Sequence, residues 1–374
     1  MKVCFIGFDN LPVLTREYGE WPIGGEQVQQ TLLARALARR GFDVSMVVYD
    51  YGQPDGAIWD GVKTLRSFRQ AAGIPVLRFI HPRLTSLWSR LKRADADAYY
   101  VSTATATLGQ VVLFARRYNK RVIFRVAHDR DCEPDALLIK YYRDKKLYEY
   151  GLRRADAILV QGERQQQAML RNYGLSSSVA RMLVDPGKLN LDFAVREIDL
   201  LWVNNLRDFK RPDRFLTLAS SVSSLRCHMI GGRQAGHERL FDQTSEGAEK
   251  LSNLTFHGQV AYHDVNDFYE KSRVFVNTSD SEGFPNSYLQ AWIRGTPVVA
   301  FFDPDGVIAR EGLGFAVTND EEMSHAVQRL TSDMTIWRAC SRRCLAYMQA
   351  RYGEDLVLTP YLTAFRGKLP RPSG

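Results

Sequence analysis

The sequence has no apolar run near the length of about 18–20 residues that a membrane-spanning helix needs. Its first ten residues, MKVCFIGFDN, have one lysine, a short apolar run and no small-residue cleavage site, so we expect a buried first strand and no signal peptide there. The cysteines are few and odd in number, and none forms a C-x-x-C pair; they are Cys4, Cys132, Cys227, Cys340 and Cys344. Free thiols in a reducing cytoplasm are therefore expected.

Motifs of several other protein classes are also missing. There is no Walker A phosphate loop, no G-x-S-x-G, and no G-x-G-x-x-G directly after the first apolar run. The stretch DRDCEPD (129–135) fails as a calcium loop, because Pro134 stands where glycine is required. It also contains an Asp-x-Asp, which some sugar-transferring enzymes use to hold a divalent ion, but we favour a polar loop. We expect no metal site and no cofactor.

The chain has 374 residues, of which 45% are hydrophobic and 25% charged, as in a soluble protein of two domains. The formal net charge of +8 favours anionic partners: nucleotide phosphates, anionic lipid headgroups or nucleic acid. Because no RNA- or DNA-binding motif accompanies the charge, nucleic acid is not expected as a partner.

Apolar strand-like runs alternate with helix-like stretches along nearly the whole chain. Such alternation predicts parallel sheets with helices on both faces, and two series of it predict two doubly wound, Rossmann-like α/β domains. We place the first domain at 1–190 and the second at 198–352, with the join in 185–199 where a Pro-Gly interrupts the pattern. Residues 353–374 are expected to form a helix and tail that pack back on the first domain.

Residues 63–94 carry many basic residues and no acid. Leu84, Leu87, Trp88 and Leu91 have the spacing of a helical apolar stripe opposite a basic face. Two interpretations remain open: a surface helix whose stripe lies in the core, or a helix that rests on an anionic membrane.

Three short segments have the character of anion or ligand sites. Gly24 and Gly25 precede a helix, where backbone amides approach an anion closely. Arg207, Lys210 and a third basic residue, Arg211, follow the first strand of the second series, at the end where open α/β sheets bind ligands. The glycine pair also fits a plain turn, and the basic segment also fits a solvated helix start.

The third segment is E-G-F-P-N-S-Y-L-Q, residues 282–290. Pro285 suits a first helical turn, and the amides near Asn286 and Ser287 would face an anion. Glu282 and Gln290 are eight positions apart, about two helical turns, so both are expected to face one cleft. His128 ends the run RVIFRVAH and is a further candidate that reaches the cleft between the domains.

In order and spacing, these segments resemble the retaining glycosyltransferases of family 4, which have the GT-B fold. The resemblance covers nearly the whole chain and includes YGLRRADAILVQ (150–161), LWVNNLRDFKRP (201–212), SEGFPNSYLQAW (281–292), RGTPVV (294–299) and DPDGV (303–307). The segment 281–292 is similar to the family's E-x7-E element, with Gln290 at the second glutamate.

The resemblance implies a function and a role for each site residue. A nucleoside-diphosphate sugar would be held mainly by the second domain, and its sugar would pass with retention to a glycan or lipid-linked acceptor on the first. Lys210 would contact the diphosphate and Glu282 a sugar hydroxyl, with His128 as the third catalytic candidate. The other donor-binding residues would be Gly24, Gly25, Arg207, Gly283, Phe284, Pro285, Asn286, Ser287 and Gln290.

Two positions depart from the family pattern. Asn205 stands where many members have an arginine, and Arg207 is a candidate to supply that charge. Gln290 can still donate to and accept from ribose hydroxyls.

Several alternatives remain. A non-catalytic or regulatory nucleotide-sugar binder of the same fold is the main one, and an epimerase or a phosphorylase are others. The basic 63–94 segment favours a lipid-linked acceptor in surface polysaccharide biosynthesis, with a cytoplasmic enzyme peripheral at the inner membrane face. The nucleotide base and the sugar cannot be read from these residues.

Overall fold

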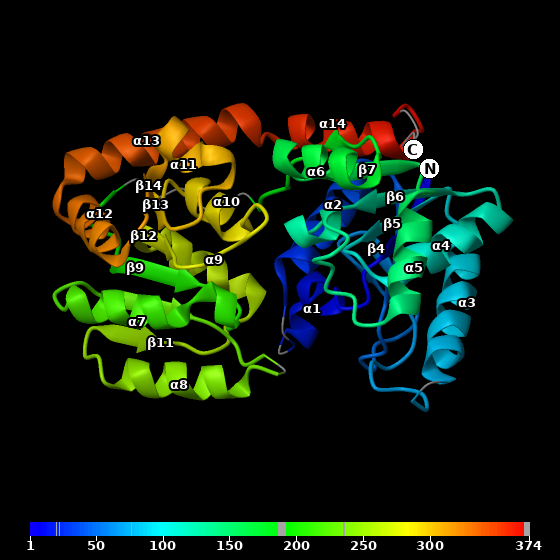
Figure 1. The fold of residues 1–374 in the computed structure, drawn as a ribbon, viewed down its shortest axis with the longest axis horizontal. Helices are drawn as coiled ribbons and strands as arrows, with labels where there is room; N and C mark the ends of the chain where they lie inside the picture. Colours follow the sequence, from blue (N-terminus) through cyan, green and yellow to red (C-terminus); the bar gives the residue numbers. More distant parts are fainter. Residues whose placement is uncertain (20, 22, 76, 186–191, 235, 370–374) are drawn as a thin grey trace. The chain divides into compact units, whose positions relative to one another are not determined.

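The computed structural model describes residues 1–369 except 20, 22, 76, 186–191 and 235. The chain forms two compact units, which we call unit 1 (Met1–Leu183 with Glu354–Gly374) and unit 2 (Val184–Gly353) (Figure 1). The expected join at 185–199, with its Pro-Gly, falls partly on 186–191 and so partly outside the described residues. Each unit is described below by itself.

Unit 1 is built on an eight-stranded sheet with the order β3-β4-β2-β1-β5-β6-β7-β8. All its neighbouring strands pair in parallel except β3 and β4, which are antiparallel. The strands are β1 (Lys2–Ile6), β2 (Asp43–Val48), β3 (Ile58–Trp59), β4 (Val62–Arg66), β5 (Ala98–Ser102), β6 (Arg121–Arg125), β7 (Ala157–Val160) and β8 (Ser178–Val179).

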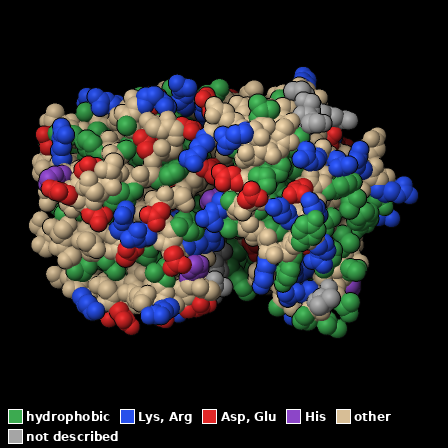
Figure 2. All heavy atoms as spheres, in the orientation of Figure 1, with side chains coloured by type: hydrophobic (Ala, Val, Ile, Leu, Met, Phe, Trp, Pro, Cys, Tyr) green, Lys and Arg blue, Asp and Glu red, His purple; other side chains and the backbone are tan. Residues whose placement is uncertain are grey.

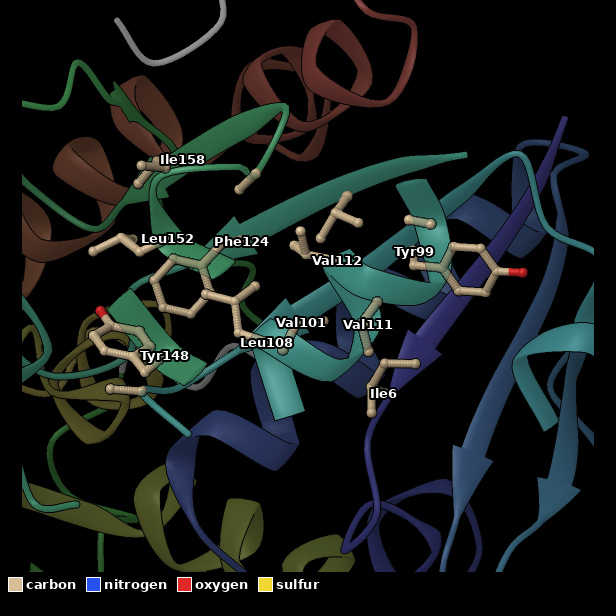
Figure 3. Close-up of a cluster of buried hydrophobic side chains, with 14 of the residues drawn as sticks. Ile6, Tyr99, Val101, Leu108, Val111, Val112, Phe124, Tyr148, Leu152 and Ile158 are labelled. Carbon is tan, nitrogen blue, oxygen red and sulfur yellow. The ribbon is translucent and has the colours of Figure 1, made fainter. Parts of the chain in front are cut away.

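The helices of unit 1 cover this sheet and bury their apolar faces on it. In Figure 3, Leu108 and Val112 from α4 pack with Phe124 from β6 and Tyr148 from α5. These side chains are at most 1% exposed, as expected for central parallel strands that are covered on both faces. The helices are α1 (Leu11–Leu14), α2 (Gly25–Arg39), α3 (Thr85–Ala94), α4 (Ala106–Arg117), α5 (Tyr142–Leu152), α6 (Glu163–Tyr173) and α14 (Glu354–Phe365).

The last helix, α14, belongs to unit 1 although it is reached only after the whole of unit 2. Phe365 lies against the rings of Phe5 and Tyr100, and the Tyr361 hydroxyl donates to the carbonyl of Arg181 at 3.1 Å. Both Tyr361 and Phe365 are buried, so the helix contributes core side chains to unit 1.

Unit 2 contains a six-stranded parallel sheet with the order β11-β10-β9-β12-β13-β14. Its strands are β9 (Ile198–Val203), β10 (Cys227–Ile230), β11 (Leu254–Phe256), β12 (Ser272–Asn277), β13 (Val298–Ala300) and β14 (Gly314–Ala316). The helices are α7 (Pro212–Ser221), α8 (Glu238–Glu249), α9 (Tyr262–Glu270), α10 (Asn286–Trp292), α11 (Val307–Glu311), α12 (Asp320–Ser332) and α13 (Met334–Arg351). Numbered from β9, the order is 3-2-1-4-5-6, that of a doubly wound dinucleotide-binding sheet.

The structure decides between the two interpretations of the 84–91 stripe. Leu87 and Leu91 are at most 1% exposed and lie in the core of unit 1, and Trp88 packs edge-on against Phe114. The apolar face of α3 therefore covers the sheet and does not point outward.

The basic face of the 63–94 segment is also less charged than its sequence indicates. Asp55, which lies outside the segment, forms ion pairs with Arg90 and Arg93, and Asp50 lies 3.5 Å from Arg69. No helix in the described part of the chain is long and apolar enough to cross a membrane. The five cysteines are all described, buried and free of disulfide bonds.

Candidate functional site

The loops that follow β9 and β12 form the candidate site of unit 2. The chain leaves β9 for β10 on one side and later returns to β12 on the other, so the two loops diverge at the carboxyl ends of adjacent strands. Open α/β sheets bind ligands at such a switch point. Lys210 lies in the first loop and Glu282 in the second.

Lys210 and Glu282, 72 positions apart in the chain, form an ion pair here. Their side chains are only 14% and 10% exposed. The Ser279 hydroxyl donates to Glu282 Oε1 at 2.7 Å, and Asn277 Nδ2 lies 3.5 Å from the same oxygen. A carboxylate held by three donors has a fixed orientation, which suits it to grip one hydroxyl of a ligand.

Buried hydrogen bonds fix the backbone under this pair. The Trp202 indole donates to Thr278 Oγ1 at 2.9 Å, and that hydroxyl donates to the Lys210 carbonyl at 2.8 Å. The Asp280 amide donates to the carbonyl of Phe209 at 2.9 Å. The two loops are thus joined by main-chain contacts, and Lys210 and Glu282 project from one rigid frame.

The other two cations of the 207–211 segment differ in their pairing. Arg211 is bound to Asp213, with Nη2 2.7 Å from the carboxylate, and its Nη1 lies 3.6 Å from Asp280. Arg207 is exposed, and its side chain has no hydrogen bond or ion pair with any residue in the described ranges. Of these two arginines, Arg207 is the one whose charge is available to an anion.

The segment 283–287 leads into α10, as expected, but the helix begins later than its pattern indicates. Pro285 is the N-cap with an extended backbone, and Asn286 is the first helical residue. The expectation that two turns of one helix relate Glu282 and Gln290 is therefore wrong: Gln290 lies on α10 and Glu282 lies in the loop before it. That both face one cleft stays a prediction. Pro285, whose backbone is extended, separates the two, so helical periodicity does not relate them.

The two departures from the family pattern have different surroundings. Asn205 lies 3.5 Å from Gln234 Nε2, in the loop that follows β10. Gln290 is half-buried, and its carbonyl accepts from Arg294 Nη1 at 3.1 Å. Its neighbours Tyr288 and Leu289 are buried, which anchors α10 to the unit.

In unit 1, Gly24 and Gly25 begin α2 as expected. Gly24 is the N-cap, with no side-chain cap, and a Cβ placed on it would come within 2.5 Å of Gln27 Oε1. That atom is the end of a flexible side chain, so a larger residue at position 24 would require only that Gln27 move. Glu26, the acid of the first turn, accepts a hydrogen bond from the Ser102 hydroxyl.

His128 follows β6 and caps the short helix 129–132. Its Nδ1 accepts from the Arg130 amide at 3.1 Å, so in the neutral ring the proton resides on Nε2. Asp131 Oδ2 accepts from the amides of Ala127 and His128 at 3.0 and 3.1 Å. The result is a half-buried histidine of fixed orientation whose Nε2 has no hydrogen-bond partner among the described residues.

Two acids of the DRDCEPD stretch, Asp129 and Asp131, are bound to other parts of unit 1. Burial raises the pKa of Asp131, whose carboxylate is occupied by backbone amides. Asp129 accepts from Gln165 Nε2 at 2.9 Å and lies 3.7 Å from Arg164. Within the described residues no three His, Cys, Asp or Glu side chains gather at a spacing that would hold a metal ion.

The sequence did not identify Asn277, Ser279 and Thr278 as parts of the site. Their signal is weak, because N-T-S-D-S-E reads as an ordinary polar turn after a strand. Only the pairing of β9 with β12 brings them beside Lys210. Gly24, Gly25 and His128 all lie in unit 1, the other unit of the chain.

Two family models match the sequence. One, described as Glycosyl transferases group 1, matches residues 197–333, and the other, a Glycosyl transferase 4-like domain, matches residues 24–184. No curated protein matches the sequence.

Solved structures share the fold over nearly the whole chain. Sucrose-phosphate synthase from Thermosynechococcus elongatus is similar with a TM-score of 0.75 and 17% identity, over 97% of this chain and 98% of that one. Anabaena HepE, in complex with UDP and glucose, has a TM-score of 0.70 and 13% identity over 99% and 100%. WaaG, a glycosyltransferase of lipopolysaccharide biosynthesis, has a TM-score of 0.67 and 16% identity over 97% and 98%. The prediction of two Rossmann-like domains in a GT-B fold is confirmed.

Proposed function

The chain belongs to the glycosyltransferases, and we propose that it is a retaining enzyme that transfers a sugar from a nucleoside-diphosphate sugar. The acceptor is a glycan or a lipid-linked saccharide, and the product enters surface polysaccharide biosynthesis. HepE bound to UDP and glucose, and WaaG in lipopolysaccharide biosynthesis, support the choice of donor and pathway.

The Lys210–Glu282 pair at the β9–β12 switch point carries this proposal. Departure of a nucleoside diphosphate builds negative charge on the phosphate oxygens, and a cation already fixed at that place stabilises the transition state. Lys210 contacts the diphosphate, and Glu282, oriented by Ser279 and Asn277, accepts a hydrogen bond from a hydroxyl of the donor sugar.

Further donor contacts come from the adjoining segments. Arg207 supplies the second positive charge, because Asn205 carries none and Arg207 has no competing partner among the described residues. The backbone of 283–287 approaches the sugar and phosphate, and Gln290 binds the ribose through its amide. Gly24, Gly25 and His128 contribute from unit 1.

We propose that the reaction needs no metal ion. Lys210 and Arg207 provide positive charge for the diphosphate, and that is the role a divalent ion has in other phosphate chemistry. Retention follows if the acceptor attacks the face from which the phosphate leaves, with the phosphate taking the proton. The described part of unit 2 pairs Glu282 with a lysine and with no second carboxylate, unlike the carboxylate pair of glycosidases.

A regulatory nucleotide-sugar binder is the second candidate function. Asn205 and Gln290 favour it, because each replaces a charged residue of the family pattern. The ordered Lys210–Glu282 pair favours the enzyme.

Contact with an anionic membrane was expected for residues 63–94. Within that segment the loop 74–80 fits such a contact better than the helix α3. Ile74, Leu77 and Ile80 are 68%, 59% and 59% exposed, whereas the α3 stripe is in the core. Arg143 stacks on the Phe79 ring, with its Cζ 3.5 Å from the centroid, and adds a cation beside the apolar side chains. Figure 2 shows apolar side chains mixed with basic ones over this part of unit 1. Such a mixture suits the interface of an anionic bilayer.

The test is transfer from UDP-, GDP- and ADP-linked glucose, galactose and N-acetylglucosamine to a membrane-lipid extract, with and without EDTA. The expected result is release of one nucleoside diphosphate with a labelled glycolipid whose anomeric configuration, read by NMR, is that of the donor. Nucleotide binding without turnover supports the regulatory binder. An inverted product contradicts the retaining mechanism.

A further inference from the structure

We infer that Tyr352 is a positioning residue for the proposed transfer: its ring holds Phe284, and with it the loop 282–285, at the place where the chain leaves unit 2. The inference rests on the proposed function, because it names a residue on which the placement of the donor sugar depends. Tyr352 acts through Phe284 and is not assigned a contact with the donor.

Tyr352 stands at the end of unit 2. It is the C-cap of α13, and its amide donates to the Met348 carbonyl at 2.8 Å. Gly353 is the last residue of unit 2, and Glu354 is the first residue of the returning part of unit 1. The ring of Tyr352 is therefore tied to one of the two points at which the chain passes between the units.

The residue on the other side of this join is held as well. Arg39 Nη2 lies 2.8 Å from Glu354 Oε2, and Arg40 Nη2 lies 3.4 Å from Glu354 Oε1. Both arginines are at the C-terminal end of α2, the helix whose N-cap is Gly24. Gly353 alone thus separates Glu354, which is held on α2, from Tyr352, which contacts the proposed donor loop.

Tyr352 belongs to a cluster of four aromatic side chains in unit 2. Phe284 lies against Trp292 and Tyr352, with ring centroids 6.3 and 6.4 Å apart. Tyr347 also lies against Trp292 and Tyr352, at 5.7 Å from each. The four side chains form a closed circuit of contacts, and aromatic pairs at such separations attract one another beyond the effect of their burial.

The members of the cluster differ in how firmly they are placed. Trp292, on α10, is completely buried, and Tyr352, at the end of α13, is 8% exposed. Phe284 is only half-buried and lies in the loop before α10. Because the Phe284 ring rests on two buried rings that belong to helices, these rings determine where the loop lies.

The loop in turn places the proposed sugar contacts. Glu282 comes two residues before Phe284, and Lys210 and Ser279 hold its carboxylate. The backbone of 283–285, which we propose approaches the sugar, is placed by the Phe284 ring instead. A shift of Phe284 would move this backbone relative to Glu282. Misplacement of a reacting group by about 1 Å can slow a reaction by about a hundredfold, so the seat of Phe284 matters for transfer.

A purely structural role for the cluster predicts a different result from a positioning role. If the cluster only stabilised unit 2, the loss of a ring would weaken every donor contact alike. In a positioning role, the sugar and the nucleotide respond differently. Lys210 and Arg207, in the loop after β9, hold the diphosphate in the proposed function, whereas the sugar also depends on the loop 282–285.

The test uses isothermal titration calorimetry on the full chain. The ligands are UDP, GDP and ADP and the conjugates of each with glucose, galactose and N-acetylglucosamine. In Tyr352→Leu, the Kd of the nucleoside diphosphate that binds wild type is expected to rise less than threefold, and that of its best conjugate at least tenfold. Tyr352→Phe keeps the ring and is expected to match wild type. The control Phe315→Leu, which removes a half-buried ring from β14 of the same unit, should change neither constant.

Phe284→Leu tests the same contact from its half-buried side, so the test stands even if Tyr352→Leu does not fold. Because the two residues act through one contact, Phe284→Leu/Tyr352→Leu is expected to weaken conjugate binding no more than the stronger single variant does. Equal weakening of diphosphate and conjugate, effects that add in the double variant, or unchanged conjugate binding in both single variants would each overturn the inference.

The behaviour of wild type separates this inference from the proposed function. If wild type binds no nucleoside diphosphate, or none of the conjugates, the proposed function fails and the inference fails with it. If wild type binds both kinds of ligand and the Leu variants bind them equally well, the inference fails alone.

Discussion

Glu282 accepts hydrogen bonds from Lys210 and from Ser279 on the same carboxylate oxygen, Oε1, while Asn277 lies 3.5 Å away. Glu282 therefore holds the Lys210 ammonium group in a largely buried position at the switch point of unit 2. The proposed chemistry of unit 2 depends on that relationship.

The pair makes separate predictions for stability and for activity. Glu282→Gln leaves Lys210 without its counter-charge in a largely buried place, so a loss of about 1–3 kcal/mol in the free energy of unfolding is expected. The double variant Lys210→Met/Glu282→Gln removes both charges and is expected to recover most of that stability. The transfer rate is expected to fall at least a hundredfold in the single variant and in the double variant. Urea unfolding and transfer rates measure the two effects. Recovery of transfer in the double variant would contradict the proposed roles.

The roles of Asn205 and Arg207 are tested by moving a charge. Arg207→Gln is expected to raise the KM for the donor about fivefold with no change in unfolding free energy, because an exposed charge near a phosphate is worth about 1 kcal/mol. Asn205→Arg added to that variant is expected to restore the KM. Arg211→Gln is the control, since Arg211 is already paired with Asp213. A KM unaffected by Arg207→Gln would show that another group neutralises the diphosphate.

Glu26 predicts a pH dependence of stability. Burial raises its folded-state pKa from 4.5 to about 7, so the folded protein binds more protons than the unfolded chain between these values. Its contribution to stability is therefore greatest below pH 4.5 and falls as the pH rises to 7. Glu26→Gln removes this loss and is expected to stabilise the protein at pH 8 by about 1–3 kcal/mol, and far less at pH 5. Equal effects at both pH values would show that Glu26 is not perturbed.

Membrane contact is expected to depend on the 74–80 loop and not on the basic face of α3. The double variant Leu77→Asp/Ile80→Asp should weaken sedimentation with phosphatidylglycerol vesicles severalfold, because each substitution removes exposed apolar area and adds a negative charge. Lys92→Glu, on the exposed face of α3, is the matched comparison and should have a smaller effect. Loss of binding in Lys92→Glu alone would restore the helix as the contact.

The sequence predicts the fold because local patterns determine it. Runs such as KVCFIGF and RVIFRVAH are buried parallel strands, and apolar alternation with helices is sufficient to expect doubly wound sheets. The contacts at the carboxyl edges of the sheets are less predictable, because they depend on which strands are neighbours. Nothing in N-T-S-D-S-E indicates that Ser279 will orient Glu282, and Glu26 meets Ser102 only because β1 lies beside β5.

Charge counted along the chain is misleading for the same reason. Residues 63–94 contain no acid, yet Asp55 forms ion pairs with Arg90 and Arg93 from outside the segment and offsets part of their charge. The helical spacing of 84–91 is real, but periodicity identifies an apolar face without saying what covers it. The core of unit 1 covers this one.

Binding of UDP, GDP and ADP, followed by thermal unfolding, shows whether Lys210 holds a nucleotide in unit 2. At one hundred times its dissociation constant, the correct nucleotide should stabilise wild type by about 2.7 kcal/mol, with or without EDTA. Lys210→Met should abolish the shift, and Lys271→Met, which changes an exposed lysine of the same unit, should leave it intact. A nucleotide shift that survives in Lys210→Met, or the absence of any shift in wild type, would show that Lys210 does not hold the diphosphate.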